Sequence, residues 1–421
     1  MTLGTDVVVD GFVVNGAATV NNGILSTSIL NGAVAGQSDG VLYNSLVLGD
    51  GTAEHPGNVS GVTAVNVTAT GTIAADGNNR ASVTETNSYV TTDYWKYQLM
   101  ETSSDIDPTG DRMDITNYMA KVGHSRDLIG NQRIRNAVDN GCFETWNITE
   151  DAQITATDKP VGQSVVYVRQ GKELSMAEGV YPEGQNFTPG YLLLEHQAGL
   201  RGNGNYISLN NFAVERNVAA GGNDLAVMPF DVTGVTPDAG YSLKRYNGST
   251  RAAYDYTFDS TNGNAWTDGK AWTDQDFANR GETEGFLIEN TSTDKIKVRF
   301  SGSGNNSYFE GGADKSVVLM KYNFNDPWTS TTSGGNRFTH KENMSWNLFG
   351  SPYLCAMNYG DMAYGRVLYG YTADTDTYKT VNTANETAGY IPAGDAVFTQ
   401  TATLRESESV SIALPSSSGR Q

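Results

Sequence analysis

Residues 347–353, NLFGSPY, decide the fold, because a related segment, DLAVMPF, occurs earlier at residues 224–230. Both segments place a polar residue, a leucine, three further residues, a proline and an aromatic residue in the same order. Downstream, LKRY at 243–246 aligns with LYGY at 368–371, and each stretch ends in a strand led by glycine, GFLI and GDAVF. The order indicates two copies of one β module, at 223–300 and 345–414, and an internal repeat of this kind sets the architecture.

The N-terminal region has a different β pattern. Short apolar runs such as VVV at 7–9, ILS at 24–26 and LVL at 46–48 alternate with Asn-Gly and Asp-Gly pairs. These pairs tolerate the positive φ that tight turns need. The runs are short and rich in glycine, so we expect stacked rungs of a solenoid or a flat sheet, with an irregular β-sandwich as the alternative.

The chain is too long for one ordinary core, and its 47 glycines favour many strands joined by turns. The sequence predicts an all-β fold in which N-terminal β repeats are followed by tandem β-sandwich-like modules. Four regions are expected: N-terminal repeats (1–85), a connecting region (86–162) with a helix over 117–138, a β domain with the first copy (163–312) and a β domain with the second (313–421).

Charge and cysteine content exclude several classes of protein. The net charge is −19 and lysine plus arginine total only 28, without the basic clusters that bind nucleic acid. No apolar run is long enough for a membrane span, and the N-terminus lacks the basic and apolar regions of a signal peptide. Cys142 and Cys355 fit no metal or redox motif, so the sequence leaves a single disulfide and two thiols as alternatives.

Residues 346–353, WNLFGSPY, resemble the "GWNLxGNPYP" strand of large surface and secreted proteins of Bacteroidota that leave the cell by the type IX route. LYGY at 368–371, Tyr378 and IPAGDAVF at 391–398 are similar to the continuation of that pattern. The family usually has asparagine where Ser351 stands, the first copy matches only loosely, and the C-terminal sorting domain of the family is not seen. The resemblance implies an extracellular or cell-surface location and carries no catalytic residues.

One candidate ligand site lies at AWTDGKAWTD, residues 265–274 of the first copy, which we interpret as an insertion absent from the second copy. Asp268 followed by glycine predicts a two-residue hairpin that brings Trp266 and Trp272 close together. Exposed tryptophans beside Asp268 and Asp274 would form a sugar-binding platform. The alternative is that both rings pack against their own module, as large aromatic side chains usually do.

The only candidate metal site is a calcium loop. Asp105, Asp107, Thr109 and Asp111 stand in a segment whose oxygen ligands fall at positions 1, 3 and 5 of such a loop, with a glycine at position 6. Thr116 occupies position 12, where a bidentate acid is needed, so a capped acidic turn is the alternative. The four histidines are isolated in sequence and form no metal-binding pattern.

These patterns favour a non-catalytic, extracellular structural or adhesive protein that assembles into a filament or layer, or binds other surface proteins. No cofactor is expected apart from calcium at the loop above. Two alternatives stay open: a carbohydrate-binding module protein that recognises glycans, and an appendage or decoration protein of a virion.

Overall fold

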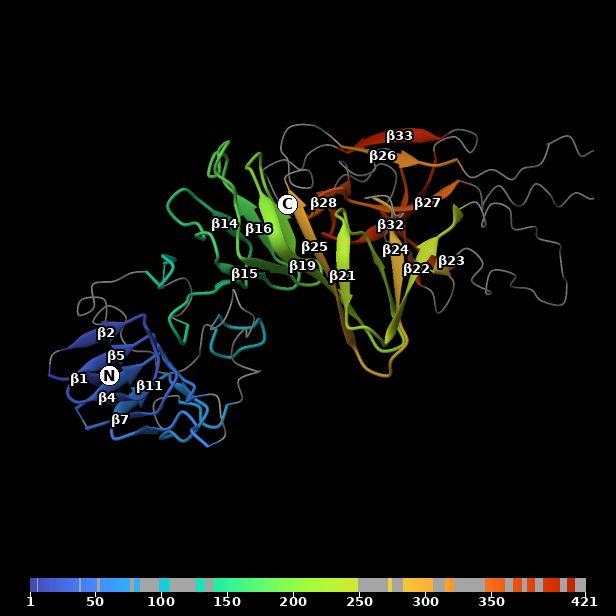
Figure 1. Ribbon diagram of the computed structural model, residues 1–421. Helices are drawn as coiled ribbons and strands as arrows, with labels where there is room; N and C mark the ends of the chain where they lie inside the picture. Colours follow the sequence, from blue (N-terminus) through green and yellow to red (C-terminus); the bar gives the residue numbers. More distant parts are fainter. Residues whose placement is uncertain are drawn as a thin grey trace, which may run out of the picture. The chain divides into compact units, whose positions relative to one another are not determined.

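The structure is a computed structural model. It describes residues 1–5, 7–37, 39–50, 54–75, 79–83, 98–106, 126–132, 139–248, 272–274, 283–305, 315–321, 345–359, 366–372, 377–382, 389–401 and 407–412. The regular elements in these ranges are β-strands, which confirms the all-β fold (Figure 1). No helix in this part of the chain is long and apolar enough to cross a membrane.

The chain divides into two compact units. Unit 1 comprises residues 1–147, 157–167 and 189–191, and unit 2 comprises residues 148–156, 168–188 and 192–421. Strands β13 (Trp146–Ile148) and β15 (Val165–Val168) lie where the division falls. Both copies of the duplicated module therefore belong to one unit, whereas the sequence predicted separate β domains for them.

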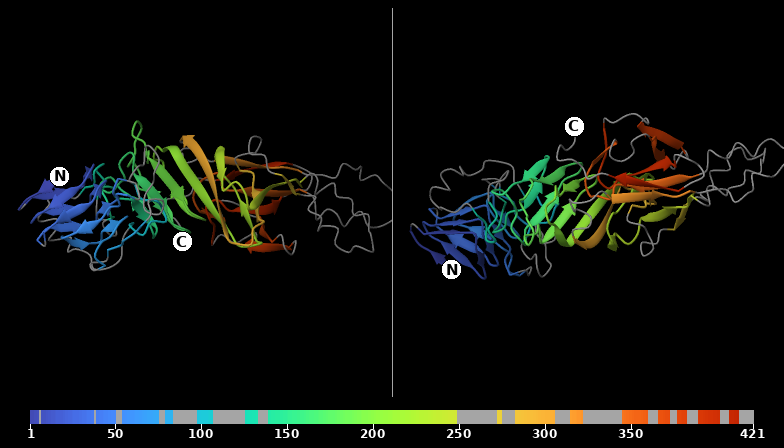
Figure 2. Two further views of the ribbon diagram at one scale, coloured as in Figure 1. Left: turned by 60° about the horizontal axis from the view of Figure 1, so that its bottom comes forward. Right: turned by 90° about the horizontal axis from the view of Figure 1, so that it is seen from above.

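Unit 1 is a parallel β-solenoid. In the described part of residues 1–83, each coil contributes one strand to each of three parallel sheets, which Figure 2 shows in blue as successive layers. The first sheet contains β1 (Thr2–Leu3), β4 (Ala18–Val20), β7 (Val34–Gly36) and β10 (Val59–Ser60). The second contains β2 (Val8–Asp10), β5 (Ile24–Ser26), β8 (Val41–Tyr43) and β11 (Thr63–Val65), and the third β3 (Val13–Val14), β6 (Ile29–Leu30), β9 (Leu46–Val47) and β12 (Thr68–Ala69).

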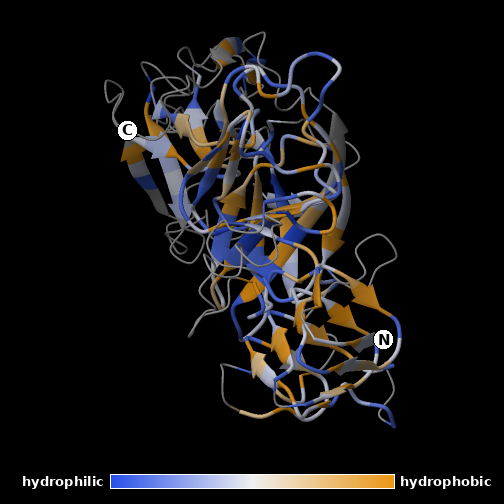
Figure 3. Ribbon diagram, turned by 90° about the vertical axis from the view of Figure 1, so that its left-hand side faces the viewer, coloured by the Kyte–Doolittle hydropathy of each residue, from blue (hydrophilic) through white to orange (hydrophobic). Residues whose placement is uncertain are grey.

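The strand register shows the length of each coil. Val8 pairs with Ile24, Ile24 with Val41 and Val41 with Thr63, so successive coils are 16, 17 and 22 residues long. Equivalent side chains stack inside the solenoid, where Leu25 and Leu42 are fully buried at paired positions. Figure 3 shows hydrophobic residues along these strands. The stacked-rung prediction is confirmed, and the flat-sheet and sandwich alternatives are wrong.

One corner of every coil has a left-handed backbone. The residue that follows each strand of the second sheet has a φ between 40° and 71°: Gly11, Thr27, Asn44 and Asn66. Glycine and asparagine adopt this conformation at low cost, whereas a β-branched threonine does so less readily. The repeated corner explains why residues that tolerate positive φ recur between the short apolar runs.

The helix expected over 117–138 falls mostly outside the described residues. The described part, 126–132, forms a turn closed by a bridge between Arg126 and Gln132, so the helix prediction is wrong there. Asp127 explains the turn, because its Oδ1 accepts hydrogen bonds from the backbone N–H groups of residues 129, 130 and 131. Such local capping competes with a helix.

Unit 2 begins with a second set of parallel strands. β14 (Ala152–Ile154), β16 (Glu173–Met176) and β18 (Gly199–Arg201) form one parallel sheet, and β17 (Tyr191–Leu194) pairs in parallel with the long strand β19 (Ser208–Val218). The pairing then becomes antiparallel, because β25 (Ile296–Asn305) joins β19 on one side and β21 (Val232–Thr236) on the other. Two short antiparallel pairs complete the described strands: β26 (Lys315–Leu319) with β33 (Glu408–Ile412), and β28 (Met357–Asn358) with β31 (Tyr390–Ile391).

The two copies form four-stranded sheets of identical strand order. Copy 1, residues 223–300, contains β20 (Asn223–Ala226), β22 (Tyr241–Tyr246), β23 (Trp272–Asp274) and β24 (Phe286–Asn290) in the order first, fourth, second, third. Copy 2, residues 345–414, repeats this order with β27 (Trp346–Gly350), β29 (Leu368–Thr372), β30 (Thr377–Asn382) and β32 (Ala396–Gln400). The duplication read from the sequence is thus present in the topology.

The register of the two sheets fixes which residues correspond. Leu225 and Lys244 both lie opposite Leu287 in copy 1, and Leu348 and Tyr369 both lie opposite Phe398 in copy 2. Residues 243–246 therefore correspond to 368–371, as the sequence alignment predicts.

The two copies share one core. A buried cluster combines side chains of both copies, among them Leu225, Tyr246, Trp346 and Phe398. The rings of Tyr246 and Phe398 lie 4.8 Å apart in an edge-to-face arrangement. Backbone bridges also join the copies reciprocally, from residue 226 to 395 and from residue 284 to 349. The copies therefore pack as a pair related by approximate twofold symmetry rather than as independent modules.

Candidate functional site

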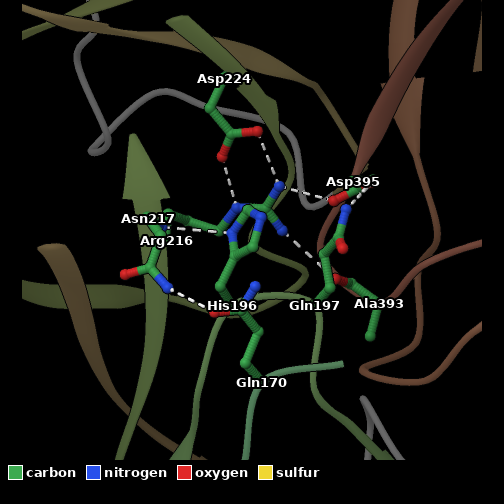
Figure 4. Close-up of polar contacts among 8 residues, drawn as sticks. All are labelled: Gln170, His196, Gln197, Arg216, Asn217, Asp224, Ala393 and Asp395. Carbon is green, nitrogen blue, oxygen red and sulfur yellow. Dashed lines mark hydrogen bonds and ion pairs between the residues drawn. The ribbon is translucent and has the colours of Figure 1, made fainter. Parts of the chain in front are cut away.

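A buried arginine joins the two copies. Arg216, on β19, is fully buried, and its Nε and Nη2 donate to the two carboxylate oxygens of Asp224 at 2.6 and 2.9 Å. Nη2 also donates to Asp395 of copy 2 at 2.6 Å, and Nη1 donates to the carbonyl of Ala393 at 3.3 Å (Figure 4). We call these side chains, Arg216, Asp224 and Asp395, the arginine clamp.

Local backbone structure positions the two acids. Asp224 lies on β20, which returns toward β19 after a turn in which Gly221 has a φ of 61°. Asp395 follows Gly394, whose φ is 75°, in a turn where the Asp395 N–H donates to the carbonyl of Pro392. Gln197 Nε2 donates to Asp395 Oδ2 at 2.9 Å, so this carboxylate is held from two sides.

The clamp alters the protonation of its members. Burial disfavours the charge of Arg216, but Asp224 and Asp395 reverse that effect and raise its pKa, so the guanidinium stays charged. Burial raises the pKa of Asp395, and Arg216 partly opposes the shift. Burial and the nearby Arg216 lower the pKa of His196 to about 4. At neutral pH His196 is therefore neutral, and its Nδ1 accepts the backbone N–H of Asn217 at 3.2 Å.

A groove of about 270 Å³ lies beside the clamp, between the two copies. Copy 1 contributes Asn223 and Asp224. Copy 2 contributes Asp395 and a set of aromatic and apolar side chains: Tyr359, Tyr371, Val381, Tyr390 and Pro392. The side chains of Asp224 and Asp395 are 17% and 21% exposed, so both carboxylates remain accessible although Arg216 holds them. The groove can therefore offer fixed hydrogen-bond acceptors next to aromatic rings.

The predicted tryptophan platform is described only in part. Trp266 and Asp268 lie outside the described residues. Trp272 is half-buried and packs against the rings of Tyr246, Tyr371 and Phe398, and Asp274 is exposed and pairs with Lys244.

The interpretation of Trp272 as part of an insertion is wrong. Trp272 lies opposite Tyr246 on β23, as Tyr378 lies opposite Tyr371 on β30. Its strand therefore has a counterpart in copy 2. The partner strand of Trp272 is β22, which is distant in sequence.

The calcium loop is described at one position. Asp105 is fully buried in unit 1, where it forms an ion pair with Arg80 and accepts hydrogen bonds from Thr68 Oγ1 and Asn140 Nδ2. Asp107, Thr109 and Asp111 lie outside the described residues. Asp105 thus has a structural role at the solenoid, and calcium binding by the loop stays a prediction.

The cysteines are buried in different units. Cys142 belongs to unit 1 and Cys355 to unit 2, and they form no disulfide with each other in the described structure. Burial raises the pKa of the Cys355 thiol to about 12, so the thiolate is not populated at neutral pH.

The arginine clamp was not among the residues singled out from the sequence. Its members are 8 and 179 residues apart, and no motif connects them. Comparison with protein-family models, with curated proteins and with solved structures finds no match to this chain.

Proposed function

We propose that this chain is a non-catalytic structural or adhesive protein of the cell exterior, of the kind secreted by Bacteroidota through the type IX route. The solenoid would serve as a stable element, and the paired copies as the part that contacts other molecules. Self-association or binding to other surface proteins would build the adhesive layer.

One observation carries this proposal: the repeated positions of both units are positions of backbone and core. In unit 1 the recurring residues form corners and the buried stack, such as Leu25 and Leu42. In unit 2 the matched residues of the two copies form strands and a shared core. Repetition of this kind stabilises an elongating β architecture, and it distributes no reactive groups along the repeat.

Location and chemistry can be tested together on the natural host. Antibodies against the full chain should label intact cells to nearly the same extent as lysed cells, with an internal protein of the host as the control that labels only after lysis. Labelling that requires lysis would contradict an exterior location.

A second experiment tests for catalysis and assembly. The purified full chain should release no soluble product from a panel of polysaccharides, and electron microscopy should show filaments or layers as its concentration rises. Release of reducing ends above the level of a heat-denatured sample would overturn the non-catalytic assignment, and particles that stay monodisperse would overturn self-assembly.

A further inference from the structure

We propose that the groove between the two copies binds a neutral saccharide, with Tyr390 as the stacking residue and the clamped carboxylates as hydroxyl acceptors. This inference rests on the proposed adhesive role, since it names the class of ligand that the adhesive part recognises. It places the site away from the predicted tryptophan platform.

The aromatic side of the groove is exposed and partly pre-oriented. Tyr390 on β31 is 36% exposed and Val381 on β30 is 38% exposed, which is unusual for large apolar side chains. The ring of Tyr371 is held by Phe398 at 6.0 Å and by Trp272 at 5.6 Å. A pyranose presents a flat C–H face, which packs on an exposed phenol ring, and the phenol hydroxyl remains available for hydrogen bonding.

The polar side of the groove consists of acceptors that are already immobilised. Arg216 fixes Asp224 and Asp395 from the buried side, and Gln197 adds a further hydrogen bond to Asp395. A carboxylate has about four lone-pair sites, so each acid can still accept a hydroxyl from the groove. Because the side chains are held before binding, little rotamer freedom is lost when a ligand arrives.

The charge of the site selects against anionic ligands. Two carboxylates face one guanidinium in the clamp, so the clamp carries a net negative charge, and the whole chain has a net charge of −19. Sulfated and uronic-acid glycans would be repelled on approach. Neutral hydroxyl groups, which donate to carboxylates without bringing charge, fit the site.

The symmetry-related position in copy 1 differs. Glu284 corresponds to Asp395, because the bridge from residue 284 to residue 349 mirrors the bridge from residue 395 to residue 226. Both carboxylate oxygens of Glu284 accept hydrogen bonds from Arg245 of the same copy. The clamp, in contrast, joins both copies, so the recognition site occurs where the copies diverge.

Calorimetric titration of the full chain tests the proposal. The probes are cellohexaose, xylohexaose and mannohexaose, with a heparin hexasaccharide as the anionic comparison. At least one neutral hexasaccharide should bind, and the heparin fragment should not. Tyr390→Ala should weaken that binding by about tenfold, Tyr390→Phe should stay within about threefold of the wild type, and Tyr241→Ala, on β22 outside the groove, should have no effect.

The proposal is overturned if none of the neutral hexasaccharides binds at millimolar concentration, if only the heparin fragment binds, or if Tyr390→Ala and Tyr241→Ala behave alike. Thermal unfolding of each variant shows whether it is folded, and Tyr390→Phe provides a second variant with minimal perturbation. None of these outcomes changes surface labelling of host cells, so failure of the saccharide site is distinguishable from failure of the proposed function.

Discussion

Replacing Arg216 with methionine should destabilise unit 2 by about 3–5 kcal/mol, because breaking a buried ion pair leaves uncompensated charge behind. Arg216 makes three hydrogen bonds to the carboxylates of Asp224 and Asp395 and one to the carbonyl of Ala393. Charge-assisted hydrogen bonds contribute roughly 1.5–3 kcal/mol each. The total is reduced because methionine no longer requires desolvation of a guanidinium, which brings the expected loss to the range above.

Thermal unfolding followed by circular dichroism measures the effect of Arg216→Met. At about 2–4 °C per kcal/mol for a unit of this size, the transition of unit 2 should fall by roughly 6–20 °C. The loss should shrink in acid, where protonation of Asp224 and Asp395 removes the unpaired charges. Adding Asp395→Asn to the variant should restore part of the stability at neutral pH.

Lys244→Met provides the matched control for Arg216→Met. It removes the partner of Asp274, whose side chain is 92% exposed, so the loss should stay below about 1 kcal/mol. A loss below about 1 kcal/mol for Arg216→Met as well would refute the clamp as the polar link between the copies.

Three further predictions concern the cores and the histidine. Leu42→Ala should cost unit 1 about 2–5 kcal/mol in denaturant unfolding, because the side chain is fully buried in the solenoid stack, and Val8→Ala, at a 36% exposed position, should cost less than about 1 kcal/mol. Gly350→Ala should lower the thermal stability of unit 2 by about 1–3 kcal/mol, because a Cβ there would overlap a valine of copy 1, and Gly234→Ala, with no atom within 4 Å of the added Cβ, should be nearly neutral. Because the pKa of His196 lies at about 4 in the folded protein and at 6.5 ordinarily, the unfolded chain takes up the proton first, and unfolding measured from pH 7 down to 4 should show stability falling across that interval by less than about 1.4 kcal/mol per pH unit. His196→Gln should remove this slope, and an unchanged slope would show that other groups cause it.

Local signals in the sequence were sufficient for the solenoid. Short apolar runs separated by residues that tolerate positive φ predict stacked rungs, and the corners at Gly11, Asn44 and Asn66 bear this out. The coil length of 16 or 17 residues is readable from the paired positions, but the third coil of 22 residues obscures it. A strict periodicity search over residues 1–50 would have found the first coils.

Long-range pairing accounts for what the sequence did not predict. Trp272 was assigned to a local hairpin because Asp268 precedes a glycine, whereas its observed partner, Tyr246, lies far upstream. The arginine clamp depends on Asp395 approaching Arg216 across most of unit 2. Neither contact has a local signature, because each depends on how the two copies pack together.

The retention of the full chain on immobilised neutral polysaccharide, measured together with the sugar released from that support, tests the central claim most directly. The account predicts that the wild-type protein is retained, that Tyr390→Ala passes through, and that no soluble sugar appears in either case. Release of soluble sugar by the wild-type protein, or equal passage of both proteins, would contradict it.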